Sequence, residues 1–309
     1  MRLRHSADFR SLLWAFVLFP LVPIAGYLQP SIAPWLLPIG LYLGYCAGVL
    51  THNHNHCPVF VGRAANRAYA VWLSCFYGAP AFMWIPTHNQ NHHRYVNADG
   101  DVAQTTRYAK RDGLWRALTY PWFSGVWQLA LVAEYVRRAR QRPDRLADIR
   151  LQVAALVVAH GGMFALALAL HGPGTGAGVY LLAFGLPALF APWSMMFTNY
   201  VQHAGCDPTS PHDHSRNFVS PFVNWFVFDA GYHTVHHENP GVHWSRYRAL
   251  HRERSAAIDP RLNPPTILSH CVTTYVVEPA RRRAERLFGP KARASERGQR
   301  LERARPAAP

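Results

Sequence analysis

The sequence has too few cysteines, in the wrong spacing, for a disulfide framework or a structural zinc finger. Its cysteines are odd in number, and none is placed in a CxxC pair: Cys46, Cys57, Cys75, Cys206 and Cys271. Domains built on disulfides or zinc need paired cysteines at short, regular spacings. We therefore expect reduced thiols and a protein that faces a reducing compartment.

Charged residues are also scarce, and positive charge is missing from two long segments. Asp, Glu, Lys and Arg make up 16% of the 309 residues, below the roughly 25% of an ordinary globular protein. No Lys or Arg lies in 11–62 or 151–215, and all 32 fall in 1–10, 63–150 and 216–305. This segregation is typical of the positive-inside distribution of membrane proteins. The net charge of +15 therefore does not indicate a nucleic-acid-binding groove, and we expect no nucleic-acid partner.

Four apolar stretches are each close to the ~20 residues that a helix needs to cross a bilayer. They cover about 11–28, 35–51, 151–170 and 179–199. The connections within each pair, QPSIAP and HGPGTGAG, carry no charge, which predicts tight turns on the outer side. The sequence therefore predicts an all-α integral membrane protein with four transmembrane helices in two hairpins. Both termini and the middle segment lie on the cytoplasmic side in this topology.

The remaining segments are predicted to lie at the membrane surface or in the cytosol. The first apolar run contains Pro20 and Pro23 and no small-residue cleavage site, so we expect a membrane helix rather than a cleaved signal. Stretches 68–85 and 114–133 are rich in Trp and Tyr and interrupted by Pro or Gly. We expect them to be interfacial amphipathic helices, a full crossing being the alternative. Their tryptophans near the headgroups would be Trp84, Trp115, Trp122 and Trp127.

The domain prediction is a single membrane domain over residues 1–280. A basic tail follows over 281–309. We expect this tail to be flexible and solvated, and a helix bound to anionic lipid is the alternative.

Histidines are numerous, eighteen in all, and many of them are clustered at helical spacing. The first cluster is THNHNH at 51–56. Because successive residues of a helix are ~100° apart, His52 and His56 share a face while His54 points away. The second cluster is THNQNHHRYVN at 87–97. There His88 and His92 share a face, and His93 is offset by about 140° to a neighbouring position.

The third cluster, GYHTVHHENPGVHW at 231–244, places three histidines within about 100° of one helical face. These are His233, His236 and His237. A fourth segment, FTNYVQHAGCD at 197–207, contains Asn199 and His203 four residues apart. All of these clusters fall at the cytoplasmic ends of helices in the predicted topology, where one layer beneath the bilayer could gather them.

Neutral imidazole binds Fe, Zn and Cu without bringing negative charge beside apolar surface. Two ions with four or five protein ligands each need eight to ten donors, and the clusters supply nine histidines. We expect the isolated histidines to have structural roles: His5, His160, His171, His212, His214, His251 and His270. His160 needs a polar partner within its membrane helix. His54 is expected to face solvent or to support a ligand, and His243 to orient the site.

The order and spacing of these clusters resemble the membrane fatty acid desaturases and their hydroxylase relatives, over roughly residues 12–250. The family has three histidine boxes. They read here as His52-NHN-His56, His88-NQN-His92-His93 and His233-TV-His236-His237. Asn199-YVQ-His203 is similar to the NxxxH element of stearoyl-CoA desaturases. The longer HxxxHH spacing of the second box also occurs in members similar to alkane hydroxylases.

The resemblance implies an O2-dependent oxidoreductase with two iron ions, held in a cytosolic helical cap that carries the boxes. It implies nine metal ligands, with Asn199 acting through a water: His52, His56, His88, His92, His93, His203, His233, His236 and His237. No cytochrome b5 domain lies within the sequence, so electrons would come from a separate donor such as ferredoxin or cytochrome b5. Carboxylates are expected partners for the imidazoles: Asp99, Asp101, Asp207, Asp229 and Glu238.

Three functions stay open at this point. The favoured one is a desaturase of a fatty acyl chain carried by lipid, CoA or carrier protein, working beside membrane lipid. The second is a hydroxylase, monooxygenase or ketolase on an alkyl, acyl or terpenoid substrate. The third class is a zinc-dependent membrane hydrolase or a metal transporter. Transport sites usually lie near the bilayer midplane, whereas these histidines are predicted at helix ends.

Overall fold

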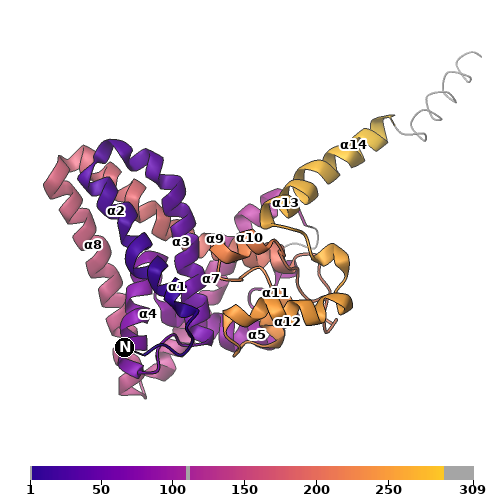
Figure 1. Cartoon of the computed structure of the whole chain (residues 1–309), viewed down its shortest axis with the longest axis horizontal. Helices are drawn as coiled ribbons and strands as arrows, with labels where there is room; N and C mark the ends of the chain where they lie inside the picture. The colour runs from indigo at the N-terminus through magenta and orange to yellow at the C-terminus, as the bar shows by residue number, and fades with distance from the viewer. Residues whose placement is uncertain (1, 109–111, 289–309) are drawn as a thin grey trace, which may run out of the picture.

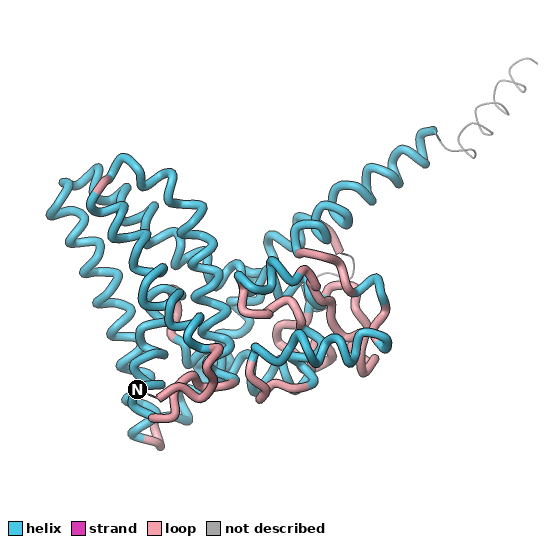
Figure 2. Tube along the Cα trace, in the orientation of Figure 1, coloured by secondary structure: helices cyan, strands magenta, loops and turns pink. Residues whose placement is uncertain are grey.

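The computed structural model describes residues 2–108 and 112–288. In this part of the chain the secondary structure is helical, and Figure 2 shows helices joined by loops with no strand. Three helices are long and apolar enough to cross a membrane: Asp8–Leu28, Pro30–His56 and Pro143–His203. The prediction of an all-helical chain with membrane-crossing helices is confirmed.

The first two of these helices form an antiparallel pair. The first comprises α1 (Asp8–Leu13), a π-helical turn η1 (Trp14–Leu18) and α2 (Phe19–Leu28). Gln29 leaves helical geometry at φ −136° and ψ 84°, and η2 (Pro30–Ile32) then leads into α3 (Ala33–His56). Helix α3 extends beyond the predicted end at residue 51. Its last turns carry the first histidine box.

The third long helix is bent in its middle. It comprises α8 (Pro143–Tyr180), η5 (Leu181–Gly185) and α9 (Leu186–His203). Gly172 has φ 75° and ψ 174°, a conformation that favours glycine, and Pro173 follows it. Beyond this break the chain packs closely against the segment that precedes it. The contact is so close that a Cβ on Gly176 would overlap the backbone of Ala167.

Two further helical segments connect the spans to the histidine region. Helix α4 (Arg63–Tyr77) ends at Gly78, and the helical segment Ala81–Tyr95 follows at an angle of 96°. This second segment contains η3 (Ala81–Met83), η4 (Ile85–His92) and α5 (His93–Tyr95). After α6 (Thr105–Tyr108), the long helix α7 (Leu114–Ala139) packs against α9.

The tryptophans of these connecting segments differ in their surroundings. Trp115 and Trp122 on α7 are 75% and 67% exposed, as an interfacial position requires, and Trp127 is half-buried. Trp84 is 5% exposed and packs against the rings of His52 and His88. The expectation that Trp84 lies near the headgroups is therefore wrong: the 96° bend turns it toward the histidines.

The C-terminal third forms a cap of short helices beside the long ones (Figure 1). It contains α10 (Pro221–Phe226), α11 (His233–Glu238), η6 (Trp244–Arg246) and α12 (Tyr247–Arg254). Two short turns follow, η7 (Ser255–Ala257) and η8 (Pro260–Leu262). The described chain ends in one helical rod, α13 (Ile267–Val272), η9 (Thr273–Val277) and α14 (Glu278–Phe288), which projects from the body. Residues 281–288 of the predicted flexible tail belong to α14, and 289–309 lie outside the described residues.

Candidate metal centre

The first histidine box lies in the last turns of α3 and divides as its spacing predicts. His52 and His56 share one face, and their rings lie 4.7 Å apart. His54 points to the opposite side, where its Nε2 lies 3.1 Å from the carbonyl oxygen of Asn66 and its ring packs on Tyr69. His54 is buried rather than facing solvent.

The second box lies in a π-helical turn, which changes the expected pairing. Segment η4 (Ile85–His92) has about 4.4 residues per turn, so residues five apart are offset by about 50° rather than the ~140° of a regular α-helix. His88 and His93 accordingly bring their Nε2 atoms to 3.0 Å, while His92 points to a second group of histidines. His88 and His92 still lie near one face, with their ring centroids 5.2 Å apart, but they belong to different groups, a division that the spacing does not predict.

The third box, on the short helix α11, also divides between two groups. His233 and His237 are four residues apart and bring their Nε2 atoms to 3.0 Å. His236 points away from them and reaches His52, with 3.0 Å between their Nε2 atoms. His203, at the end of α9, completes the second group, with its Nε2 at 2.9 Å from that of His233.

All nine predicted histidines therefore converge, in two groups of five and four. Within each group the nitrogen atoms lie within 4.8 Å of one another. The first group is His52, His56, His88, His93 and His236. The second is His92, His203, His233 and His237. No other histidine of the described residues belongs to either group.

In the group of five, four nitrogens form a closed ring. The Nε2 atoms of His52, His88, His93 and His236 are joined in this ring by distances of 2.9, 3.0, 3.0 and 3.0 Å. Two imidazole nitrogens that bind one metal ion at ~2.1 Å and roughly at right angles are about 3 Å apart, so these distances suit a shared ion. The ring of His56 lies 4.6–5.1 Å from each of the other four rings. Its Nε2 is buried without a hydrogen-bond partner.

The group of four is arranged around two close pairs of nitrogens that share His233. The Nε2 atoms of His203 and His237 each lie within 3.0 Å of Nε2 of His233. His92 lies beyond them, with its ring 4.8 Å from that of His203 and 4.9 Å from that of His237. The Nε2 of His92 is buried and lacks a hydrogen-bond partner. Four imidazoles leave space in a coordination sphere for a small molecule.

These distances suit metal ions and do not suit neutral imidazoles alone. Two facing Nε2 atoms at 3.0 Å cannot both accept, and several such contacts meet within each group. Burial lowers the pKa of His233, His236 and His237 well below the usual histidine value, and the neighbouring imidazoles lower it further. The rings are therefore neutral with lone pairs available, and the two clusters are consistent with a metal centre.

Hydrogen bonds to the far nitrogen fix the orientation of several of these rings. Nδ1 of His92 lies 2.7 Å from the Asp101 carboxylate. Nδ1 of His203 donates to the carbonyl of His214 at 3.0 Å, and Nδ1 of His236 lies 2.9 Å from the Tyr247 hydroxyl. The Asp101 carboxylate and the His214 carbonyl can only accept, so they place the proton on Nδ1 and leave the Nε2 lone pair free, as is typical of metal-binding histidines. Tyr247 and the His214 carbonyl were missed in the sequence, where neither has a recognisable spacing to a box.

Only one of the five predicted carboxylate partners contacts a clustered histidine among the described residues. It is Asp101, which also accepts from the backbone N–H groups of Asn97 and Ala103. Burial raises the pKa of Asp101. The interactions with His92 and with these two N–H groups lower it more, so the pKa lies below its ordinary value. Glu238 pairs instead with His212 and Arg254.

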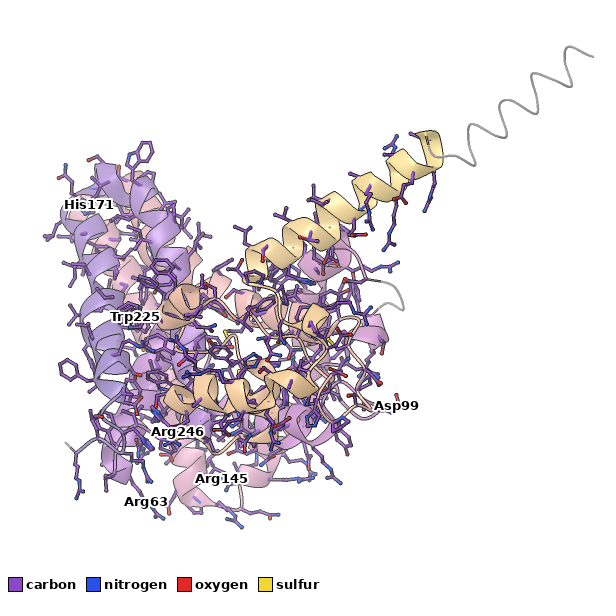
Figure 3. The ribbon with its side chains drawn as sticks, turned by 45° about the vertical axis from the view of Figure 1, so that its right-hand side comes forward. Arg63, Asp99, Arg145, His171, Trp225 and Arg246 are labelled. Atoms are coloured by element: carbon purple, nitrogen blue, oxygen red, sulfur yellow. The ribbon has the colours of Figure 1, made fainter. Side chains whose placement is uncertain are left out.

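The other three carboxylates face away from the two groups. Asp229 pairs with Arg248 at 3.3 Å. Asp207 caps its own loop through the hydroxyl and N–H of Thr209, and Asp99 is an exposed loop residue, visible at the edge of the cap in Figure 3. Their predicted roles were wrong because sequence proximity to a box does not fix the direction of a side chain.

The isolated histidines have structural partners, as predicted, in most cases. His160 bonds to the Tyr180 hydroxyl at 2.9 Å and to the Cys75 carbonyl at 3.0 Å, which satisfies it within its membrane helix. His171 lies 2.9 Å from the Tyr27 carbonyl. His243 contacts the buried Asp8 carboxylate at 3.1 Å and stacks on His5.

Three apolar cavities run past the two groups and share walls. The largest, about 260 Å³, lies among α9, α10 and the start of α13 and includes Phe197, Val227 and Ile267. It shares Ala230 and Gln202, among others, with a cavity of about 40 Å³ at His52, His88, His233 and His236. That cavity shares walls with a third of about 110 Å³, bounded by α7 and α9, whose lining includes Met83, Gln128, Met196 and Asn199.

Asn199 lies where the second and third cavities meet, one turn before His203. It is buried, and its Nδ2 donates to the hydroxyl of Tyr120 at 3.3 Å. Tyr120 in turn donates to the carbonyl of Ala103, two residues from Asp101. Asn199 therefore lines the same cavities as His88 and His233, and within the described residues its side chain forms no hydrogen bond to the clustered imidazoles.

Membrane-length helices that carry two buried histidine groups beside an apolar cavity are consistent with a membrane-bound enzyme that has a metal centre. The sequence matches the fatty acid desaturase family over residues 30–267. The chain belongs to this family, and it is an oxygen-dependent oxidoreductase.

Two curated relatives are sphingolipid delta(4)-desaturase/C4-monooxygenases. The human protein is 30% identical over 248 residues, which cover 74% of this chain and 69% of the relative. The protein of Rattus norvegicus is 28% identical over 221 residues, 67% of this chain and 61% of the relative. No solved structure matches the chain.

Proposed function

We propose that the chain is a membrane-bound desaturase that introduces a double bond into a fatty acyl chain carried by lipid, CoA or carrier protein, using two histidine-bound iron ions and O2. The observation that carries this proposal is the row of apolar cavities that passes the histidine groups. A bound alkyl chain in this row would place its middle carbons beside His88 and His233 and its ends in the two larger cavities. Which of the three carriers bears the acyl group lies outside this proposal.

The nine clustered histidines are the proposed iron ligands. The first ion would be held by the group of five, and the second by the group of four together with a water bound to Asn199. When bound, the iron pair supplies the oxidising power that breaks unactivated C–H bonds. Electrons come from a separate donor such as ferredoxin or cytochrome b5.

The protein's own contribution is binding, orientation and exclusion of water. Trp84, Met196 and Thr198 line the cavity beside the histidines and confine a methylene chain there. The tautomers fixed by Asp101 and the His214 carbonyl keep the Nε2 lone pairs of His92 and His203 directed into the group of four, and Tyr247 holds the ring of His236 in place. A mismatch of about 1 Å between a held carbon and the reacting centre costs roughly a hundredfold in rate, so this confinement determines which carbon reacts.

Hydroxylation is the second candidate, because the names of both curated relatives combine desaturation with C4-monooxygenation. The two outcomes share the first C–H cleavage and differ in whether a second hydrogen is lost or oxygen is added. Mass spectrometry of lipids from cells that express the chain separates them. A lipid lacking two hydrogens supports desaturation, and a lipid with one added oxygen supports hydroxylation. Zinc as the native metal with neither product would refute both.

The proposed topology has four spans in two hairpins, with both termini and the metal centre on the cytoplasmic side. A straight helix of 61 residues would be roughly 90 Å long, about three times the hydrocarbon core, which favours two spans joined at Gly172. Figure 3 shows His171 at one end of the long helices and Arg63 and Arg145 at the other. Reporter fusions at the termini and near Gly172 test this arrangement.

A further inference from the structure

The helical rod from Ile267 to Phe288 carries an exposed apolar row. Small or apolar residues occupy every fourth position from Leu268 to Ala284: Leu268, Val272, Val276, Ala280 and Ala284. Leu268 is 70% exposed and Val276 57%, and Leu287 adds another exposed apolar side chain at 55%. In a regular α-helix a four-residue repeat drifts by ~40° per step, and the π-helical turn η9 offsets part of this drift. The row therefore stays on one face through both halves.

The opposite face of the first half is fixed to the body of the protein. Tyr275 is buried, and its hydroxyl donates to the Asp112 carboxylate at 3.0 Å. The same carboxylate accepts from Tyr200 on α9 at 3.0 Å. Because these bonds fix the rotation of the rod, the apolar row faces away from the protein, with nothing in the described chain covering it.

The second half of the rod is strongly basic. Helix α14 carries Arg281, Arg282, Arg283 and Arg286 against Glu278 and Glu285. Arg281 and Arg282 pair with Glu278, whereas Arg283 and Arg286 form no ion pair within the described residues. Arg282, Arg283 and Arg286 line a cavity of about 920 Å³ together with Tyr275 and Asp112, so they lie on the face opposite the apolar row. A helix with one apolar and one basic face is typical of helices that lie on anionic membranes.

We propose that this rod lies on the bilayer surface, with its apolar row in the acyl layer and its arginines on anionic phospholipid headgroups. The membrane-spanning helices of the same chain place the bilayer beside the rod. Ile267, the first residue of the rod, also lines the apolar cavity of about 260 Å³, so the rod begins at the wall of that cavity. This inference does not depend on which reaction the metal centre performs.

Amide hydrogen exchange of the full chain in nanodiscs tests the proposal without substrate or turnover. Residues 278–288 should exchange more slowly in discs that contain phosphatidylglycerol than in discs of phosphatidylcholine alone. The variant Arg283→Gln/Arg286→Gln should lose roughly fivefold in protection per arginine in the anionic discs. The control Arg246→Gln/Arg252→Gln removes the same charge from the cap and should leave the rod protected.

A second variant tests the apolar row. Val272→Asp/Val276→Asp should lower the protection of the rod in both kinds of disc, while exchange in α3 and α9 reports that the fold is intact. Equal protection in the two lipid compositions would overturn the anionic contact. If neither variant changes the amide exchange of the rod, the proposed membrane contact is overturned.

Discussion

The carboxylate of Asp101 lies 2.7 Å from Nδ1 of His92, and both side chains are buried. This contact makes His92 present Nε2 to the group of four. The same carboxylate accepts two backbone N–H groups, so it also fixes the loop that follows the second histidine box. One residue thus couples the loop to the candidate metal site.

The first prediction follows from this coupling. Asp101→Asn keeps an acceptor for His92 but removes the negative charge that strengthens the imidazole as a donor to metal. We expect iron affinity to fall by about 10–100-fold, the usual effect of removing such a partner. Chelator competition measures this loss. Asp99→Asn removes an exposed carboxylate of the same loop, and an equal loss there would contradict the role of Asp101.

The second prediction concerns the division into two groups. His236→Ala removes a nitrogen from the group of five, and His237→Ala removes one from the group of four. Each variant should retain one of the two ions and lose turnover, as metal analysis of the purified protein and product assays would report.

His214→Ala provides the control for both variants. Its ring lies outside the two groups, and the backbone carbonyl that orients His203 is unchanged by the substitution. It should retain both ions. Full metal content in either His236→Ala or His237→Ala would show that the substituted residue is not a ligand.

The third prediction tests the close contact between α3 and α9. A Cβ on Gly44 would overlap the carbonyl oxygen of Pro187, whereas a Cβ on Gly161 meets nothing within 4 Å. Gly44→Ala must push the two helices apart, at about 1–3 kcal/mol for overpacking. We expect Gly44→Ala to lower the unfolding temperature and Gly161→Ala to leave it unchanged in the same detergent. Similar unfolding temperatures would indicate that the helices can separate without cost.

The identity of the nine histidines could be predicted from the sequence because metal ligation needs many donors in a few segments. Their grouping could not, since it depends on a π-helical turn that moves His93 beside His88. No local sequence rule distinguishes that turn from a regular helix, and tertiary packing selects it.

The supporting residues were predicted less well for a related reason. Tyr247 reaches His236 only because α12 folds back over α11, and Trp84 reaches His52 because of the bend at Gly78. Both contacts depend on the path of the chain between elements. The apolar spans, in contrast, follow from hydropathy alone, and the structure extends them by a few residues at their ends.

The fourth prediction concerns the tie between the N-terminal segment and the third histidine box. Asp8 is 1% exposed. It accepts a hydrogen bond from the Trp244 indole at 3.1 Å and contacts Nε2 of His243 at the same distance. His243 precedes and Trp244 begins the turn η6, which leads to Tyr247, and Tyr247 contacts His236. Asp8→Ala leaves the buried Trp244 indole N–H without its acceptor and should therefore lower stability by about 1–3 kcal/mol, the usual cost of a buried polar group left unsatisfied.

Chemical unfolding of the purified protein measures this change, and a double-mutant cycle isolates the pair. Asp8→Ala/His243→Ala should be less destabilised than the sum of the single variants, because the second substitution removes the group that the first leaves unpaired. Ser11→Ala deletes only one hydrogen bond to the same carboxylate and should cost about 1 kcal/mol. Additive effects of Asp8→Ala and His243→Ala would show that the two side chains act independently, and the N-terminal segment would then have no role in holding the third box.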